Sequence, residues 1–245
     1  MRDYQKEYDG RVAFIRDLVA SSGVKGIVFG NSGGKDSALV GILCKAACDD
    51  TVGVIMPCAS QRNFGSDMED GNALAEQFGI ETRTVDLTPV REAAVAAMGA
   101  VTDINDASLA NIAPRLRMTT LYTIAGSESR LVAGTGNRSE RYMGYFTKWG
   151  DGACDFNPIA DLTATEVIEF LDWLGAPLSI RTKAPSAGLF EGQTDEQEMG
   201  VTYAAIDRYI LTGEADERDK AIIDRFHSRS AHKRILAAVY EDIDE

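Results

Sequence analysis

The sequence predicts an α/β fold, a doubly wound parallel sheet flanked by helices, followed by a helical C-terminal part. Strand-like runs alternate with helical patterns along residues 26–133, and such alternation builds right-handed βαβ units in a parallel sheet. The run 51–56 is also continuously apolar, which is typical of a parallel strand buried on both faces. We expect a single domain over 1–245, because this length can bury one sizeable core and no low-complexity linker interrupts it.

The individual elements follow from periodicity and from start and stop signals. Strands are predicted at 26–29, 51–56, 82–85 and 130–133, and loops at 58–66 and 183–195. Asp67 is a candidate N-cap for a helix that Gly79 ends, and Thr163 with Glu166 forms a capping box for another. The predicted helices cover 2–22, 35–48, 67–78, 88–112 with breaks at Gly99 and 103–106, 115–125, 163–174, 202–211, 217–228 and 231–240.

The formal net charge of −13 and the pI near 4.7 describe an acidic protein. Such a charge repels nucleic acids and anionic membranes, so we expect neither as a partner. No run approaches the roughly 18 apolar residues of a membrane span, and the charged N-terminus lacks the apolar core of a secretion signal. The four cysteines have no zinc-site spacing, and we expect a reducing, cytoplasmic location.

A glycine-rich stretch joins the first predicted strand to the following helix. Strand, glycine turn and helix point backbone N–H groups and the positive end of the helix dipole at a phosphate. The stretch is not a Walker A loop, because Asp36 follows Gly34-Lys35 and Phe29 occupies the place of the first glycine. Two glycines alone would indicate only a tight turn, but the accompanying serines and aspartate favour a phosphate site. Its residues are Gly30, Asn31, Ser32, Gly33, Gly34, Lys35, Asp36 and Ser37.

A second strand-to-helix junction, 134–140, follows the strand predicted at 130–133. Ligands of open α/β sheets bind in the crevice at the carboxyl ends of the strands, and a parallel sheet can bring distant junctions to one crevice. We therefore expect Asp36 and Glu140 to lie at the same site. Each of these acids could instead simply cap a helix start, where negative charge is favoured.

The pattern Ser-Gly-Gly-x-Asp-Ser resembles the loop of the N-type ATP pyrophosphatases, which cleave ATP between the α and β phosphates. Further blocks resemble the NAD synthetases, in the same order along nearly the whole chain. The resemblance implies an adenine nucleotide alpha hydrolase-like fold and a homodimer. It also implies amidation of nicotinate adenine dinucleotide (deamido-NAD) with ammonia to give NAD, AMP and pyrophosphate through an acyl-adenylate. The blocks are 115–122, 134–140, 144–152, 157–159, 185–189 and 232–234.

The same resemblance implies roles for individual residues. Asp36 and Glu140 would hold Mg2+, and the glycine-rich loop would bind ATP with help from Gln61, Thr135 and Ser186. Lys148 and Asp151 are candidate catalytic residues. Asp151 lies between two glycines, where it could take the proton of ammonium or form only a bare turn. The residues that would contact deamido-NAD are Arg115, Lys148, Asp155, His232 and Lys233.

One position departs from the NAD synthetase pattern. The family usually carries a lysine that contacts ATP phosphate where this sequence has Ala164. Lys35, at the variable position of the glycine-rich loop, could compensate, or its side chain could face solvent. If nothing compensates, the chain would be a catalytically weakened or non-catalytic nucleotide-binding homologue.

The sequence also bears on the acceptor and on the nitrogen donor. Another ligase with this loop, or a tRNA-modifying thiolase, would share the ATP site, but the absent CxxC pair and the charge of −13 argue against the tRNA branch. Relatives that use glutamine attach an amidase domain, for which 245 residues leave no room. We therefore expect no fused glutaminase domain and free ammonia as the nitrogen donor.

Overall fold

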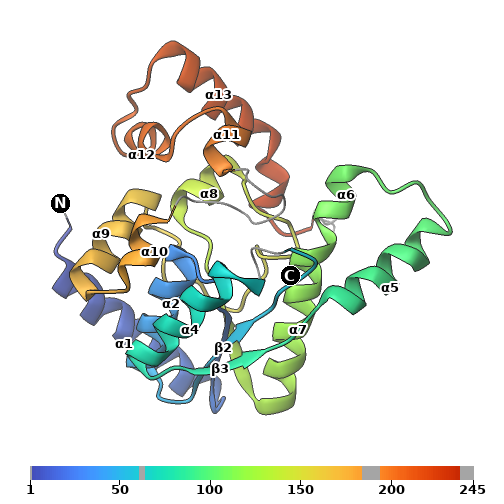
Figure 1. Cartoon of the computed structure of the whole chain (residues 1–245). Helices are drawn as coiled ribbons and strands as arrows, with labels where there is room; N and C mark the ends of the chain where they lie inside the picture. The colour runs from blue at the N-terminus through green and yellow to red at the C-terminus, as the bar shows by residue number, and fades with distance from the viewer. Residues whose placement is uncertain (1, 61–63, 184–193, 238–245) are drawn as a thin grey trace, which may run out of the picture.

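The computed structural model describes residues 2–60, 64–183 and 194–237. Within these residues the strands form one parallel, four-stranded sheet of order β3–β2–β1–β4 (Figure 1). The prediction of a doubly wound parallel sheet is confirmed. The strands are β1 (Gly26–Gly30), β2 (Thr51–Ile55), β3 (Glu81–Thr84) and β4 (Arg130–Ala133).

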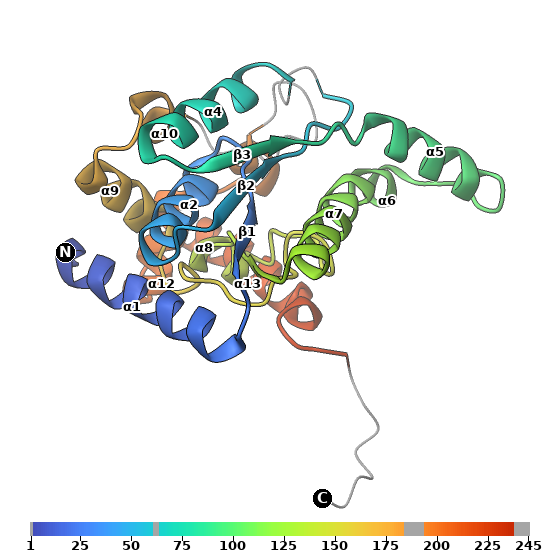
Figure 2. The ribbon, with the colours of Figure 1, turned by 90° about the horizontal axis from the view of Figure 1, so that it is seen from below.

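Helices cover both faces of the sheet because its central strands carry apolar side chains on both sides. Ile27 and Phe29 of β1 contribute to the core on one face, whereas Val28 contributes to the core on the other. Figure 2 shows α7 (Ile112–Glu128) on the second face, opposite the helices of the first. The first face is covered by α1 (Tyr4–Ser22), α2 (Lys35–Ala47), α4 (Ser66–Phe78), α9 (Ala164–Leu174) and α10 (Leu178–Thr182).

Helix α2 runs through the larger core, as its uniformly apolar sequence predicted. Every residue from Ser37 to Cys44 is buried, and α2 contacts β1 on one side and α1, α4 and α9 on others. Burial of this kind stabilises a fold by roughly 25 cal/mol per Å² of apolar surface. The helix that begins at the glycine-rich loop is therefore held rigidly in the molecule.

Two regions stand apart from the sheet and its covering helices. Helices α5 (Thr88–Gly99) and α6 (Asp106–Ala110) project to one side, and neither contains a buried residue (Figure 2). The predicted break between them is confirmed. The C-terminal part is helical, as expected, and shares a small core with α8 and with the start of α9. Helix α8 comprises Arg138–Met143. The helices of the C-terminal part are α11 (Asp195–Met199), α12 (Tyr203–Thr212), α13 (Glu217–Arg229) and the short η1 (Ala231–Lys233).

The strand order creates a topological switch point beside β1. The chain moves from β1 to β2 and β3 on one side, whereas β4 pairs with β1 on the other side, with Phe29 opposite Ala133. The loops that follow β1 and β4 therefore leave the sheet at neighbouring positions. A single parallel bridge between Ala133 and Phe156, which the sequence did not predict, extends the pairing beyond β4.

Two local predictions were wrong. Asp67 is not an N-cap: α4 begins at Ser66 with Gly65 in the N-cap position, and Asp67 lies in the first turn. The helix predicted at 231–240 does not form over its described part, where only η1 is helical. Tertiary contacts decide this second case, because Lys233 and Arg234 donate hydrogen bonds to carbonyls of the segment 141–146 and turn the chain.

No helix in the described part of the chain combines the length and apolar character needed to cross a membrane. All four cysteines are free thiols. Burial raises the pKa of the Cys44 thiol, which keeps it protonated inside the core. Cys44 is therefore a packing residue, in agreement with its place in the apolar helix α2.

Candidate active site

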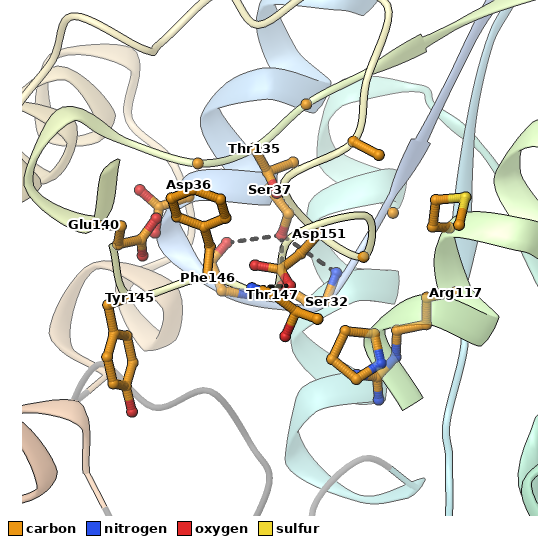
Figure 3. Close-up of a pocket in the computed structure, with 18 of the residues that line it drawn as sticks. Ser32, Asp36, Ser37, Arg117, Thr135, Glu140, Tyr145, Phe146, Thr147 and Asp151 are labelled. Carbon is orange, nitrogen blue, oxygen red and sulfur yellow. Dashed lines mark hydrogen bonds between the residues drawn. The ribbon is translucent and has the colours of Figure 1, made fainter. Parts of the chain in front are cut away.

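The loops after β1 and β4 open into one cavity of about 820 Å³ (Figure 3). Its wall also includes parts of α7, α13 and the segment 143–153. Open α/β sheets bind ligands at the switch point, beyond the carboxyl ends of their strands. The cavity lies at that position and is large enough for a nucleotide, so we take it as the candidate active site.

The glycine-rich loop has a backbone path that only glycine permits at one position. Gly33 has φ of +69°, and a Cβ there would lie 2.1 Å from the carbonyl oxygen of Asp67. Side-chain hydrogen bonds hold the loop on both sides of this glycine. The Asn31 side chain donates to the Gly71 carbonyl at 2.9 Å, and the hydroxyls of Ser32 and Ser37 lie 3.0 Å apart. The loop is thus packed closely against α4.

The start of α2 forms an anion site beside this loop. The first N–H groups of any α-helix lack carbonyl partners within the helix. Gly34 occupies the N-cap of α2 and has no side chain to cap them. Gly34 and the first residues of α2 line the cavity, so uncapped donors and the positive end of the helix dipole lie at its wall. This arrangement suits a phosphate.

Asp36 and Glu140 approach one another across the switch point, as the sequence predicted (Figure 3). Asn137 connects them. Its Nδ2 donates to Oδ1 of Asp36 at 2.9 Å, and its own side-chain oxygen accepts the N–H of Glu140 at 3.0 Å. Glu140 in turn accepts the N–H of Asn137 at 3.0 Å and completes a capping box at the start of α8. Glu140 therefore caps a helix and also faces the second carboxylate.

Lys35 points into this acidic site, so the expectation that it could face solvent is wrong. The side chain is 7% exposed, and its Nζ lies 2.5 Å from Oδ2 of Asp36. Burial alone would lower the pKa of Lys35, but the charges of Asp36, Glu140 and Asp195 outweigh it and raise that pKa. Burial raises the pKa of Glu140 well above its usual value; Asp36 raises it further, whereas Lys35 opposes the rise.

The C-terminal part adds acidic side chains to the site that no sequence motif indicated. Asp195, at the start of α11, lines the cavity and accepts a hydrogen bond from the hydroxyl of Tyr203 at 3.2 Å. Glu198 also lines the cavity and accepts one from Tyr145 at 2.5 Å. Asp195 had no recognisable spacing relative to Asp36, so its position depends on the packing of α11 against α12.

The donor set fits a magnesium ion. Mg2+ is usually held by one or two carboxylates, with water and substrate phosphates completing its coordination. Asp36 and Glu140 provide two carboxylates next to the phosphate site, and the ammonium of Lys35 between acidic groups shows that the position attracts a cation. The described residues contain no cluster of three or more metal-ligating side chains. A metal here would therefore depend on the nucleotide for part of its coordination.

Asp151 lies in the same cavity, in the turn between Gly150 and Gly152 (Figure 3). Its Oδ1 accepts the N–H of Thr147 at 3.0 Å. Asp151 is an exposed residue at the cavity wall, and desolvation by the protein around its carboxyl raises its pKa. Lys233 also lines the cavity, where its Nζ donates to the carbonyls of Gly144 and Phe146. A carboxyl with a raised pKa at the wall of a substrate cavity suits proton transfer.

Several residues expected at the substrate site lie just outside the cavity wall. Arg115, Lys148 and His232 gather from α7, the segment 143–153 and η1. Arg115 donates to the Lys148 carbonyl at 3.4 Å, and the Lys148 Nζ donates to the His232 carbonyl at 2.6 Å. Asp155 supports the scaffold here, because it accepts hydrogen bonds from the Tyr122 hydroxyl and the Val132 N–H.

Arg117, two positions after Arg115 on α7, makes a different contact from that of Arg115. It lines the cavity, and its Nε donates to the carbonyl of Met56 at 3.1 Å. Thr135 lines the cavity as well. Gln61 and Ser186, the remaining ATP candidates, lie outside the described residues.

Ala164 is 1% exposed at the start of α9. It packs in the C-terminal core with Met143 and Met199, and it is not among the described residues that line the cavity. Its N–H donates to the hydroxyl of Ser139 at 3.1 Å. A small residue is therefore well packed at this position, while the cation nearest the carboxylates is Lys35.

Fold and site together place the chain among the α/β nucleotide-binding proteins, with the nucleotide site at the switch point of a parallel sheet. The chain matches the NAD synthase family over residues 7–242. It is 44% identical to an NH3-dependent NAD+ synthetase of Carboxydothermus hydrogenoformans over 97% of this chain and 98% of the relative. The chain therefore belongs to the NAD synthase family, and it is a ligase.

Solved structures agree with this assignment. An NMN synthetase from Francisella tularensis has a TM-score of 0.93 and 37% identity, covering 98% of this chain and all of that one. An NH3-dependent NAD synthetase from Campylobacter jejuni has a TM-score of 0.81 and 29% identity, covering 98% of this chain and all of that one. The expected fold is therefore confirmed across nearly the whole chain.

Proposed function

We propose that the enzyme uses ATP and Mg2+ to amidate deamido-NAD with ammonia, giving NAD, AMP and pyrophosphate, in the cytoplasm. The observation that carries the proposal is the meeting of a phosphate site and a carboxylate pair in one cavity. Asp36 approaches Glu140 through Asn137, next to the uncapped start of α2. The close sequence relatives named as NH3-dependent NAD+ synthetases support the same reaction.

The chemistry proceeds in two displacements. A carboxylate is a poor electrophile, so an oxygen of the nicotinate carboxylate attacks the α-phosphorus of ATP, and the bond to pyrophosphate breaks. Ammonia then attacks the carbonyl carbon of the acyl-adenylate, and AMP leaves with the bonding electron pair. Asp36 and Glu140 would hold the metal ion, which when bound would neutralise the charge of the phosphates. Backbone donors of the glycine-rich loop hold the departing pyrophosphate.

Asp151 is our candidate for the proton of ammonium, because only neutral ammonia can attack the carbonyl carbon. Its carboxyl lies inside the cavity, and desolvation brings its pKa upward, closer to the working range of a base. Lys148, which lies at the adjoining rim of the cavity, is the second candidate catalytic residue. The dinucleotide would extend along this rim, where Arg115, Lys148 and His232 gather, with Lys233 and Asp155 nearby.

A homodimer accounts for the projecting helix α5. We define the α5 face by Val90 and Met98 of the helix and Val101 just after its end, which are 49%, 40% and 83% exposed. α5 contains no buried residue, and an isolated short helix is marginally stable in water. Exposed apolar side chains gathered on one projecting element are typical of an interface. A second copy of this chain is the proposed partner for the α5 face.

A second candidate function is amidation of nicotinate mononucleotide to nicotinamide mononucleotide (NMN). The structural likeness to the Francisella tularensis NMN synthetase, which exceeds that to the Campylobacter jejuni enzyme, favours it. Both acceptors carry the same nicotinate carboxylate, so the ATP site and the chemistry would be unchanged. The two candidates differ in whether an adenylate half of the acceptor is recognised.

An assay of AMP and of the amide product tests these functions. The purified enzyme is supplied with ATP, Mg2+ and ammonium, with deamido-NAD or nicotinate mononucleotide as the acceptor, and both products are separated by chromatography. We expect a higher kcat/KM for deamido-NAD and no product when glutamine replaces ammonium. A preference for the mononucleotide would establish the second candidate. ATP binding without AMP formation from either acceptor would instead indicate the non-catalytic homologue.

A further inference from the structure

Lys35 is a buried basic side chain inside an acidic site. Its Nζ lies 2.5 Å from Oδ2 of Asp36 and 5.6 Å from the ring centroid of Tyr203. Glu140 and Asp195 are near enough for their charges to act on it. The ammonium therefore has one carboxylate in contact, an aromatic face nearby and two further carboxylates whose charges act on it, which is an environment suited to a cation.

The other lysines among the described residues that line the cavity have different partners. Lys183 lies 2.7 Å from Oδ1 of Asp67 and 2.6 Å from Oδ2 of Asp70. Lys233 donates to two backbone carbonyls of the segment 143–153. Carboxylates placed together away from water repel one another unless a cation neutralises them. Lys35 is in position to do this for Asp36 and Glu140 when no metal–nucleotide complex is bound.

We propose that Lys35 is a built-in substitute for the metal, and that it exchanges its carboxylate partner for ATP phosphate when the metal–nucleotide complex binds. The proposal rests on the metal site of the proposed function. Mg2+ at Asp36 and Glu140 would repel an ammonium beside it. The phosphates that arrive with the metal provide a new anionic partner at the same turn of α2, where Lys35 is the first helical residue.

This exchange gives Lys35 two effects of opposite sign. Without nucleotide, the ammonium competes with the metal for the carboxylates and weakens metal binding. With nucleotide, the same ammonium strengthens the binding of phosphate. Lysine suits such an exchange because its charge is a compact point on a flexible four-carbon chain. A lysine with a purely structural role would not weaken metal binding while strengthening phosphate binding.

The test is the substitution Lys35→Met, with Mn2+ as the metal probe. Free Mn2+ is measured by electron paramagnetic resonance in the absence of nucleotide. We expect the variant to bind Mn2+ roughly tenfold more tightly than the wild type, because a competing positive charge is removed. At saturating Mn2+, calorimetry should show ATP binding roughly tenfold weaker, because a charge-assisted phosphate contact is lost.

Two variants serve as controls for Lys35 itself. Lys45→Met removes a lysine from the far end of α2, where Lys45 pairs with the exposed Asp49, and should change neither affinity. Lys35→Arg keeps the charge, so it should bind Mn2+ no more tightly than the wild type. Equal Mn2+ affinities for the wild type and Lys35→Met would overturn the proposal. Unchanged ATP affinity in Lys35→Met would overturn the phosphate contact.

A third variant separates the metal site from the role of Lys35. Glu140→Gln should lose most Mn2+ binding; if it binds Mn2+ like the wild type, the proposed metal site is wrong and the proposal fails with it. If Lys35→Met is destabilised, thermal unfolding can still report Mn2+ binding, because a ligand that binds the folded state raises the Tm. Mn2+ should raise the Tm of Lys35→Met more than that of the wild type. An equal or smaller rise would count against the exchange.

Discussion

Asn137 is the side chain that holds the two loops of the site together. It is fully buried, donates to Asp36 and accepts the N–H of Glu140. In the sequence, Asn137 lies in the second junction, where a helix N-cap is the ordinary use of asparagine. Its second hydrogen bond reaches 101 positions back along the chain and became visible only in the folded structure.

Asn137→Ala should lower the free energy of unfolding by about 2 kcal/mol, because it removes a cap and leaves buried polar groups without partners. Urea unfolding measures this change. Asn105→Ala is the matched control, since Asn105 caps the exposed helix α6 by accepting the N–H of Ser108; it should cost about 1 kcal/mol or less. Mn2+ affinity should fall only in Asn137→Ala. Equal destabilisation by the two substitutions would show that the link to Asp36 is unimportant.

At the scale of whole elements, a network of ion pairs joins α1 and the residues before it to the loop before α9 and the first turn of α9. Arg11 contacts Asp161 at 2.6 and 2.8 Å and Glu7 at 2.6 Å. Arg2 contacts Glu166, whose other oxygen accepts the N–H of Thr163 in the predicted capping box. The capping box is thus confirmed, and the same glutamate also pairs with Arg2, which precedes α1.

Arg11→Met should lower the free energy of unfolding by about 1–2 kcal/mol near pH 7, because a partly exposed network of charge-assisted hydrogen bonds is lost. Burial alone would raise the pKa of Asp161, but the hydrogen bond and charge of Arg11 outweigh it and lower that pKa below its usual value. The stabilisation is therefore present above the pKa of the unfolded state and is lost as pH falls through the folded-state value.

Chemical denaturation of wild type and Arg11→Met at several pH values measures this effect. The difference between the two proteins should shrink as the pH falls below about 4. Arg16→Met, an exposed position on the same helix, is the matched control and should have little effect at any pH. A difference that persists unchanged at low pH would mean that Arg11 acts through packing of its aliphatic chain instead.

At the scale of the whole molecule, the arrangement separates a rigid catalytic crevice from a projecting arm. The sheet and its covering helices hold the two loops at the switch point, while α5 and α6 extend away from them (Figure 1). The net charge of −13 repels anionic substrates in general. Basic side chains nevertheless gather around the cavity, where Lys35, Arg117 and Lys233 line it.

Val101→Asp should convert the proposed dimer to a monomer, because a charge would be buried without a partner in the interface. Val101 is 83% exposed in the single chain, so the fold itself should be unaffected. Sedimentation velocity measures the change, and we expect the dissociation constant to rise roughly tenfold or more. Leu178→Asp, at a 64% exposed position of α10, is the control and should leave the dimer intact. A wild-type monomer at all concentrations would refute the proposed homodimer.

Much of the fold could be predicted because its signals are local. The apolar run at β2, the glycines that end α4 and α9, and the capping box of Thr163 each depend on neighbours within a few residues. The helix predicted after Ser230 failed because distant carbonyls capture the side chains of Lys233 and Arg234. Local propensity cannot register such contacts.

By itself, the sequence determined the parallel α/β architecture, the two loop junctions and the pairing of Asp36 with Glu140. These depend on strand–helix alternation and on the rule that parallel strands end at one edge. Only the tertiary structure decided that Lys35 points inward, that Asn137 bridges the loops and that Asp195 joins the site. The reason is physical: side-chain direction and charge neutralisation depend on neighbours that the chain brings together only when it has folded.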